Sequence, residues 1–452
     1  MLNLIPTLLT VASIASSALA VPVIKVANSD VASAIPNQYI VVFKDGVTDA
    51  ATDAHTNRIS SFHSKIAARD PKSGRKGKKT RGLHKKIKVS GKSSFKGYTG
   101  EFDKETLSEI LNSPEVSYVE QDAVVKVNLV DVPDVPEDTE SLEKRVYRSS
   151  ATWGLDRISH GKFKAPYRYY YNDAWSGQGA TVYVIDTGIM REHSQFADMY
   201  TGKTRVTWGT NTIDNDNTDG AGHGTHCAGT IGGLTYGVAR KVSLVAVKVL
   251  DKNGSGTWSS VIEGINWVAK NATSGVSVAS MSLGGGFSAA VNQAINALHS
   301  AGVAVIVAAG NENDDASKYS PSSAEKAITV GAIDEDGKVA DFSNYGSTVD
   351  ILAPGVNVLS SVISSTVATD YYSGTSMATP HVAGIAAYFI AKSLAETGKG
   401  ITPTDMKTTL LNNAWPATDA ELGKYRRGAA SKIAGNDYCN GSYKGCDVNM
   451  LD

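Results

Sequence analysis

The sequence predicts an α/β fold in which a parallel β-sheet has helices on both faces and follows a small α+β unit. The first observation is a series of short, Val-rich segments without polar alternation, which is typical of strands buried on both faces. The second is that helical segments separate these strands along the chain, which favours parallel pairing. The third is an earlier strand–helix–loop–helix–strand pattern of about 90 residues, enough for a separate small unit.

Composition narrows the function classes. The 452 residues are 42% hydrophobic and 20% charged, and the formal net charge is −1. Such a chain is long enough to bury a large core. Because its charges balance, no overall field draws it to nucleic acid or to an anionic membrane. We therefore expect no nucleic-acid partner and no membrane partner, and we predict a monomer.

The first 20 residues predict a secretory signal peptide. Met1–Ala20 is apolar and ends in Ala-Leu-Ala, a small-residue pattern that places the cleavage site after Ala20. The stretch carries no Lys or Arg, so an uncleaved anchor is the alternative. Its short length and its interrupting Ser and Thr residues argue against a membrane span. We expect a secreted protein.

A secretory route permits two kinds of modification. Cys439 and Cys446 lie close enough in sequence to close a small disulfide loop, which leaves Cys227 over, but spacing alone does not decide the pairing. The sequons at Asn271 and Asn440 predict acceptors for N-linked glycans.

The small α+β unit is predicted over residues 38–127. Residues 38–45 and 116–127 are β-rich, while residues 47–68 and 105–111 have helical spacing. Between the helices, residues 65–96 carry 13 Lys or Arg and one acid. With few aromatic residues for base stacking, this stretch predicts a solvated, flexible insertion rather than a nucleic-acid site.

Residues 130–145 predict an extended acidic linker. They contain two prolines and many Asp and Glu residues, so they have little to bury. The linker ends in Lys144-Arg145, a dibasic pair accessible to a trypsin-like or kexin-like processing protease. We therefore place a processing site after Arg145, with one segment over 21–145 and a second over 146–452.

Beyond Trp153, short strands and helices alternate. We predict strands over residues 180–185, 243–250, 276–283, 303–308 and 327–330, and helices over 222–232, 259–270 and 289–300.

Four polar side chains lie at the ends of these predicted strands and helices or directly beside them. Asp186 ends the first strand, His223 opens a helix and Asn311 follows the strand over 303–308, while Ser376 precedes an apolar helical run. Chemistry in parallel sheets gathers at the carboxyl ends of the strands. These groups suit acyl transfer: a hydroxyl nucleophile, an imidazole base, a carboxylate that orients the base and an amide that stabilises an oxyanion.

Ser376 has a second interpretation, because serine is also a preferred N-cap. A helix start offers unpaired N–H groups and a positive dipole end, which an oxyanion also favours. The octapeptide SGTSMATP (373–380) alone does not decide between cap and nucleophile.

Five segments resemble those of subtilisin-family serine proteases. They are VIDTGI (184–189), GHGTHCAGT (222–230), SLGGG (282–286), AAGN (308–311) and SGTSMATPHVAG (373–384). The order Asp…His…Ser matches this family. The Cys after GTH, with YGVA (236–239), VKVLDKNGSG (247–256) and FSNYGS (342–347), is most similar to the proteinase K branch, which includes fungal extracellular and vacuolar proteases.

The resemblance implies a role for each residue. Ser376 is the nucleophile, His223 the base, Asp186 its orienting partner and Asn311 part of the oxyanion hole. A peptide substrate adds as a strand between two segments whose glycines let main chain approach main chain. The residues expected to bind it are Gly254, Ser255, Gly256, Trp258, Ser282, Leu283, Gly284 and Gly285.

The first segment resembles the inhibitory propeptide of the same family, although its basic insertion departs from the usual compact form. The whole chain is then a preproenzyme: a secreted serine endopeptidase of broad specificity that its own propeptide folds and inhibits. The cut at Arg145 is made either by the enzyme itself or by a kexin-like processing protease. The alternatives are a vacuolar protease of this family and a catalytically silent binding protein. Protein and peptide substrates are the expected partners.

The resemblance also implies a structural calcium ion. The family's strong site uses an Asp at the spacing of Asp350, and backbone carbonyls here on Glu325 and Ala327 complete the protein ligands. Hard oxygen ligands suit Ca²⁺.

Two nearby features predict structure rather than metal binding. His226 and Cys227 lack the Glu of the H-E-x-x-H pattern, so we expect a packed histidine and a buried thiol. The acidic run over 211–219 lacks EF-hand spacing and predicts a solvated loop.

Overall fold

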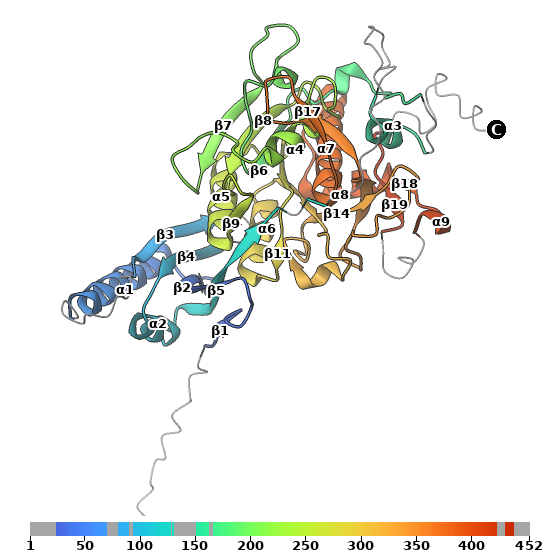
Figure 1. Cartoon of the computed structure of the whole chain (residues 1–452). Coiled ribbons are helices and arrows are strands. Elements are labelled where there is room, and N and C mark those ends of the chain that lie inside the picture. Colours follow the sequence, from blue (N-terminus) through green and yellow to red (C-terminus); the bar gives the residue numbers. More distant parts are fainter. Residues whose placement is uncertain are drawn as a thin grey trace, which may run out of the picture.

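The structure is a computed structural model. It describes residues 24–69, 80–89, 94–127, 129–130, 151–161, 166–422 and 430–437. The predictions for Ala20, Arg145, Cys439, Asn440 and Cys446 fall outside the described residues. Within them, the chain forms a small N-terminal body and a larger body that lie against each other (Figure 1).

A nine-stranded sheet forms the centre of the larger body. Its strands are β6 (Thr181–Asp186), β7 (Val206–Asn211), β8 (Ser243–Lys248), β10 (Ser277–Met281), β12 (Ala304–Ala308), β14 (Ile328–Ile333), β15 (Ile351–Pro354), β18 (Trp415–Pro416) and β19 (Lys432–Ile433). The order is β18-β19-β15-β14-β12-β10-β6-β8-β7, with β18 antiparallel and all other pairings parallel. The predicted parallel sheet is confirmed.

Helices cover both faces of this sheet (Figure 1). They are α4 (His223–Gly232), α5 (Trp258–Asn271), α6 (Ala289–Ser300), α7 (Thr375–Thr397) and α8 (Pro403–Asn412). Val182 and Val184 of β6 share a core with α4 and α7, whereas Tyr183 and Ile185 share a second core with α5 and α6. Alternate residues of one strand thus enter opposite cores, which explains the apolar run without polar alternation.

The remaining elements of the larger body are short. They comprise α3 (Trp153–Ser159), α9 (Asp419–Leu422), the 3₁₀ turns η1 (Asp173–Trp175), η2 (Ser194–Phe196) and η3 (Ala316–Lys318), and the strands β9 (Ser255–Thr257), β11 (Gly285–Gly286), β13 (Tyr319–Ser320), β16 (Val358–Ser361) and β17 (Thr369–Tyr372).

The N-terminal body is a sheet with two helices on one face. It contains β1 (Val26–Ala27), β2 (Ala34–Phe43), α1 (Asp49–Arg69), β3 (Gly82–Val89), β4 (Phe95–Glu101), α2 (Lys104–Leu111) and β5 (Val116–Lys126), in the sheet order β1-β5-β2-β4-β3. Ile59 of α1 and Ile110 of α2 pack on one face. On the other face, Ile40, Val42 and Ala123 share a core with α5 and α6 of the larger body.

The prediction of a flexible insertion over residues 65–96 is wrong where β3 and β4 form. Ile87, Val89 and Phe95 are buried, and their spacing alternates with lysines. The lysines pair with acids across the surface: Lys85 with Glu263, Lys86 with Asp53 and Lys88 with Asp49. Because β3 is an edge strand, outward lysines are compatible with pairing and protect the edge. The high charge of this stretch concealed the two-residue alternation of buried and exposed side chains that is typical of a strand.

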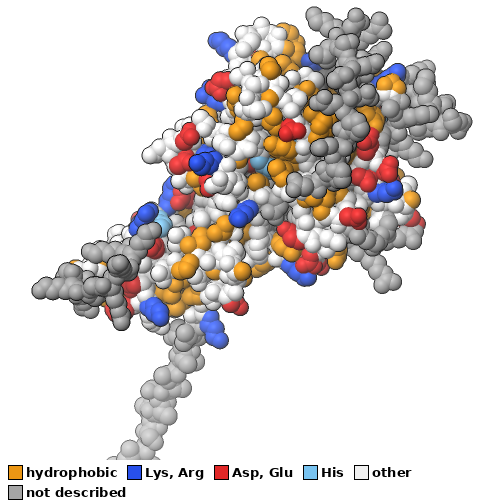
Figure 2. Space-filling model, in the orientation of Figure 1, with side chains coloured by type: hydrophobic (Ala, Val, Ile, Leu, Met, Phe, Trp, Pro, Cys, Tyr) orange, Lys and Arg blue, Asp and Glu red, His pale blue; other side chains and the backbone are white. Residues whose placement is uncertain are grey.

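The surface carries both signs of charge. Positive and negative side chains are interspersed over the face drawn in Figure 2. Among the helices of the described ranges, none combines the length and the apolar composition that a membrane span requires.

Candidate active site

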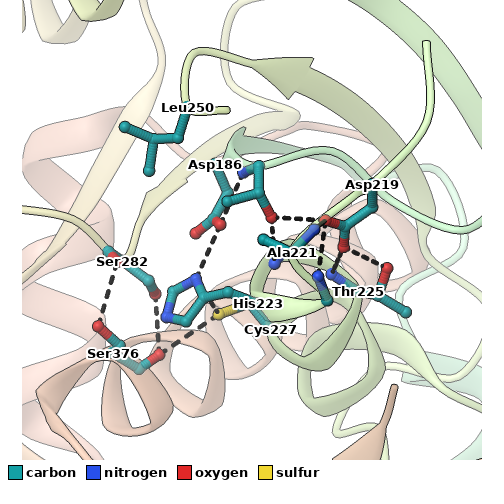
Figure 3. Close-up of polar contacts among 12 residues, drawn as sticks. Asp186, Asp219, Ala221, His223, Thr225, Cys227, Leu250, Ser282 and Ser376 are labelled. Carbon is teal, nitrogen blue, oxygen red and sulfur yellow. Dashed lines mark hydrogen bonds and ion pairs between the residues drawn. The ribbon is translucent and has the colours of Figure 1, made fainter. Parts of the chain in front are cut away.

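Asp186 and His223 meet at the carboxyl end of the central sheet. Asp186 is the last residue of β6 and His223 is the first residue of α4. Oδ1 of Asp186 lies 2.8 Å from Nδ1 of His223, and both side chains are buried (Figure 3). The Asp186 main-chain carbonyl also accepts from the N–H groups of Val249 and Leu250 at 2.9 and 3.3 Å, which ties β6 to the end of β8.

The electrostatics of this pair favour a base at Nε2. Burial is the largest single effect and lowers the pKa of His223, but Asp186 and Cys227 together raise it well above its ordinary value. Because Nδ1 faces a carboxylate, it carries the proton, and Nε2 of the neutral ring has the lone pair. Nε2 is buried and has no hydrogen-bond partner within the described residues. The imidazole is therefore oriented and leaves one nitrogen available.

Ser376 is the second residue of α7, and it is not the cap of that helix. The N-cap is Gly374, whose φ of +148° lies in the region that favours glycine. Ser376 and Ser282 exchange two hydrogen bonds: Ser376 Oγ donates to the Ser282 carbonyl at 3.1 Å, and Ser282 Oγ donates to the Ser376 carbonyl at 2.9 Å (Figure 3). The hydroxyl thus lies at a helix start without capping it.

Asn311 is held by the residue that precedes Ser376. Its Oδ1 accepts from both the N–H and the Oγ1–H of Thr375, each at 2.8 Å. Fixing the amide oxygen also fixes the position of the NH₂ group on the other branch of the amide. Asp186, His223, Asn311 and Ser376 are thereby brought to one end of the sheet.

Asp219 belongs to this site, although the sequence prediction placed it in a solvated loop. It is 6% exposed. Its Oδ1 accepts from Thr187 Oγ1 at 2.8 Å and from the Gly222 N–H at 2.9 Å, and its Oδ2 accepts from the N–H and Oγ1–H of Thr225 at 2.9 and 2.6 Å (Figure 3). Because Gly222 has no side chain to cap α4, Asp219 does so and holds the turn that carries His223. In the sequence, the glycine at the N-cap position of the GHGTH segment was the signal that another side chain must cap this helix.

His226 and Cys227 are packed as predicted. His226 Nε2 lies 2.9 Å from the Val358 carbonyl, and its ring stacks on Tyr372 at 4.4 Å between centroids. Burial lowers the pKa of His226 to about 3, so the ring is neutral. Cys227 is fully buried, burial raises the pKa of its thiol, and its Sγ lies 3.5 Å from the Ser376 carbonyl.

The predicted substrate-binding segments lie on either side of the strand that ends the N-terminal body. Val124–Lys126 of β5 pairs antiparallel with Ser255–Thr257 of β9. Lys126 bridges to Gly284 on the opposite side, and the Val127 N–H donates to the Gly254 carbonyl at 3.0 Å. The two segments therefore form a cleft that binds an extended chain by its main chain.

Trp258 and Gly285 form an apolar wall of this cleft. Trp258 is 2% exposed and shares a core with Val125 of the strand in the cleft. A Cβ at Gly285 would lie 3.0 Å from Trp258 and 3.4 Å from Val125, so a side chain at this position would crowd both. Leu283 is buried beside them. Because alternate side chains of a strand point to opposite sides, the wall contacts only every second side chain of a bound strand.

Val130 contacts the loop that leads into Ser376. The Val130 N–H donates to the Ser373 carbonyl at 3.0 Å, three residues before Ser376. Val127 is therefore bound by one substrate-binding segment, and Val130 by the loop that precedes Ser376.

Two carboxylates of β5 contact helix starts of the larger body. Glu120 accepts from Ser288 Oγ at 2.7 Å and from the Ala289 and Ala290 N–H groups at 2.8 and 3.2 Å, at the start of α6. Asp122 accepts from the Ser259 N–H at 3.1 Å, at the start of α5. Anions are favoured at helix starts. Burial raises the pKa of both carboxyl groups.

A lysine contacts two of the predicted calcium ligands. Nζ of Lys407 lies 2.7 Å from Asp350 Oδ1 and donates to the Ala327 carbonyl at 3.3 Å. The Thr329 N–H donates to the second carboxylate oxygen of Asp350 at 3.0 Å. The Glu325 carboxylate pairs with Lys326. With Lys407 in this position, Asp350 Oδ1 and the Ala327 carbonyl already bind an ammonium group, so these two oxygens do not fit a divalent cation.

Asn271, the described sequon, is exposed at the end of α5, and its Nδ2 donates to the Trp267 carbonyl at 2.8 Å. Glycosylation at this position stays a prediction.

Two family models match the chain. Residues 177–439 match the subtilase family of peptidases, and residues 38–128 match the peptidase inhibitor I9 family.

Curated relatives match over most of the chain. A cuticle-degrading serine protease of Arthrobotrys oligospora is 50% identical over 432 residues, which cover 96% of this chain and 98% of that protein. A cuticle-degrading serine protease of Orbilia oligospora is 52% identical, with 86% and 85% covered. Subtilisin-like protease 2 of Pseudogymnoascus destructans is 49% identical, with 79% and 80% covered.

Among solved structures, a cold-adapted subtilisin-like serine proteinase matches with a TM-score of 0.57 and 42% identity. The match covers 64% of this chain and 99% of that one.

Proposed function

We propose that this chain, which belongs to the subtilase family and is a serine endopeptidase with an I9 inhibitor propeptide, cleaves peptide bonds with Ser376, His223 and Asp186. The observation that carries the proposal is the buried 2.8 Å contact between Asp186 and His223, beside Ser376 and within a cleft that accepts an extended chain. No other polar partner competes for Nε2 of His223 within the described residues.

The proposed reaction begins with a proton transfer. A rotation of the Ser376 side chain exchanges the Ser282 carbonyl for Nε2 of His223, which takes the hydroxyl proton as Oγ attacks the substrate carbonyl. The Asn311 NH₂ and the Ser376 N–H donate to the oxyanion, and the start of α7 adds its dipole. His223 then gives its proton to the leaving amine, and water releases the acyl group by the same route.

We expect broad specificity because the cleft binds main chain. The segments 254–256 and 283–285 contact the backbone of β5 and its continuation, and the contact that reads a side chain is the apolar wall at Trp258. We propose extended segments of proteins as substrates, with an apolar residue preferred at that wall. Cuticle proteins are a candidate substrate class, because two relatives are cuticle-degrading proteases.

We also propose two cuts during maturation. We propose that the bond for self-cleavage lies between Val127 and Val130, because Val127 binds Gly254 in the cleft and Val130 binds Ser373, three residues before Ser376. A kexin-like enzyme then cuts after Arg145, so that the mature chain starts at Val146. The propeptide body inhibits the cleft until it is released.

The predicted signal peptide supports a secreted enzyme, and a vacuolar location is the second candidate. Assaying culture medium against cell lysate separates the two. The family fold commonly binds structural calcium, but binding at Asp350, Glu325 and Ala327 requires Lys407 to leave.

The catalytic assignment is tested with the Ser376→Ala chain. We expect hydrolysis of a peptide substrate to fall on the order of 10⁴-fold or more, and labelling by a fluorophosphonate to disappear. A matched control is Ser365→Ala, which removes a hydroxyl from a loop residue of the same body. Labelling of the Ser376→Ala chain at wild-type level contradicts the assignment.

A further inference from the structure

We propose that Lys407 supplies the positive charge at the predicted calcium site, so that this site stabilises the fold without a bound ion. Lys407 lies on α8, and its ammonium group contacts Asp350 Oδ1 at 2.7 Å and the Ala327 carbonyl at 3.3 Å. Both oxygens are predicted calcium ligands.

The position of Lys407 follows from how α8 is anchored. Met406 and Leu410 are buried at 0% and 1% exposure, and Thr402 caps the helix by accepting from the Asp405 N–H. The helix is therefore fixed on the larger body on both sides of Lys407. A fixed helix directs the flexible lysine stem toward the same pair of oxygens and reduces the entropy lost in the contact.

The contacts join three separate segments. Asp350 lies just before β15, Ala327 just before β14 and Lys407 within α8. The second Asp350 oxygen is already bound by the Thr329 N–H. An ammonium group has three donors and no acceptor, so it links a carboxylate and a carbonyl in the way that a small cation does.

The charges around the site already balance. The carboxylates are Asp350 and Glu325, and the ammonium groups are Lys407 and Lys326. The nearby lysines and burial lower the pKa of His299, burial being the larger cause, so this ring stays neutral. A divalent cation at Asp350 would lie next to the Lys407 ammonium group, which already balances that carboxylate, and this is unfavourable.

The test compares thermal stability with and without calcium in four full-length chains, all carrying Ser376→Ala to prevent self-digestion. The chains are otherwise unchanged, Asp350→Asn, Lys407→Met, and Lys407→Met with Asp350→Asn. Methionine keeps the apolar stem and suits the helix, and it removes only the charge. The measured quantity is the difference in Tm between excess CaCl₂ and excess chelator. Calcium sites elsewhere in the chain contribute equally to all four values.

We expect the same calcium-dependent difference in the otherwise unchanged chain and in Asp350→Asn, because no ion binds at Asp350 while Lys407 is present. Lys407→Met should lower Tm in chelator by roughly 1–3 °C, as expected for one partly exposed ion pair. It should also gain a calcium response that Lys407→Met with Asp350→Asn lacks, because binding to the folded state raises Tm.

Two results overturn the proposal. One is a larger calcium response in the otherwise unchanged chain than in Asp350→Asn, which means that calcium displaces Lys407. The other is a Lys407→Met chain with unchanged Tm in chelator and no calcium response that depends on Asp350. All four chains lack the nucleophile, so neither result bears on the catalytic assignment.

Discussion

The middle and the end of β5 contact the peptidase body by different chemistry. Near its middle, Glu120 and Asp122 use side-chain carboxylates to bind the starts of α6 and α5. At its end, Val124–Lys126 uses its main chain to pair with β9 and Gly284. Any peptide can reproduce the second contact, whereas the first requires two acids on a folded body.

The two kinds of contact suit different processes: main-chain pairing suits cleavage, and the carboxylate contacts suit inhibition. Main-chain pairing aligns a segment with Ser376 without fixing its sequence, so it serves substrate and propeptide alike. Glu120 and Asp122 both precede Val127, so the proposed cut beyond Val127 does not sever the segment that carries their contacts. A propeptide that has been cut can therefore stay on the peptidase body, because the folded N-terminal body carries its affinity.

The largest expected effect is a difference in pH dependence between catalysis and propeptide binding. Asp186 raises the pKa of His223 against the opposing effect of burial, and only the neutral ring accepts the Ser376 proton. We expect kcat/KM of the mature enzyme to fall about tenfold for each pH unit below that pKa. A rate that stays constant between about pH 8 and pH 5 contradicts this.

Propeptide binding should respond in the opposite direction. Burial raises the pKa of Glu120 and Asp122 in the complex, so the complex takes up protons and acidification does not weaken it. Binding of the propeptide to the Ser376→Ala enzyme over the same pH range is the control. Weaker binding at lower pH would falsify the role assigned to these carboxyls.

A smaller effect is expected from Glu120→Ala. The change leaves Ser288 Oγ and two N–H groups at the start of α6 without their acceptor, which costs about 2 kcal/mol or roughly 30-fold in the inhibition constant of the propeptide. The matched control is Asp53→Ala, whose exposed carboxylate pairs with Lys86 inside the same body. Equal inhibition constants for the two variants refute the body contact as the source of affinity.

The smallest effect is expected at the cleft. Val125 is 1% exposed and packs with Trp258, so Val125→Ala should weaken inhibition by about 1 kcal/mol, roughly fivefold. Its neighbour Val124 is 37% exposed, and Val124→Ala should leave the inhibition constant within about twofold. If both changes have the same effect, alternate side chains are not read by the cleft.

The sequence predicted those features that depend on local pattern. The apolar runs of β6 and β12 identified buried strands, and the polar residue after each strand identified Asp186 and Asn311 as candidate site residues. The pattern failed at β3, where Lys85, Lys86 and Lys88 surround the buried Ile87 and conceal the apolar alternation of an edge strand. There, pairing with Asp49, Asp53 and Glu263 compensates for the charge, and those partners are distant in sequence.

The roles of two residues could be recognised only from the folded chain. Asp219 looked like part of a polar loop until its contacts with Thr187 and Thr225 were known. Lys407 follows Met406 in an ordinary amphipathic helix, and only packing brings it to Asp350, which lies far earlier in the sequence. Long-range polar pairing of this kind leaves no local pattern.

The central claim is that the propeptide strand lies in the cleft as a substrate does. Mass spectrometry and N-terminal sequencing of fragments from the full-length chain and from its Ser376→Ala variant test it most directly. We predict a cut between Val127 and Val130 in the first chain and none there in the variant, while a cut after Arg145 by a kexin-like enzyme occurs in both. A cut between Val127 and Val130 in the Ser376→Ala chain, or its absence from the active chain, contradicts the account.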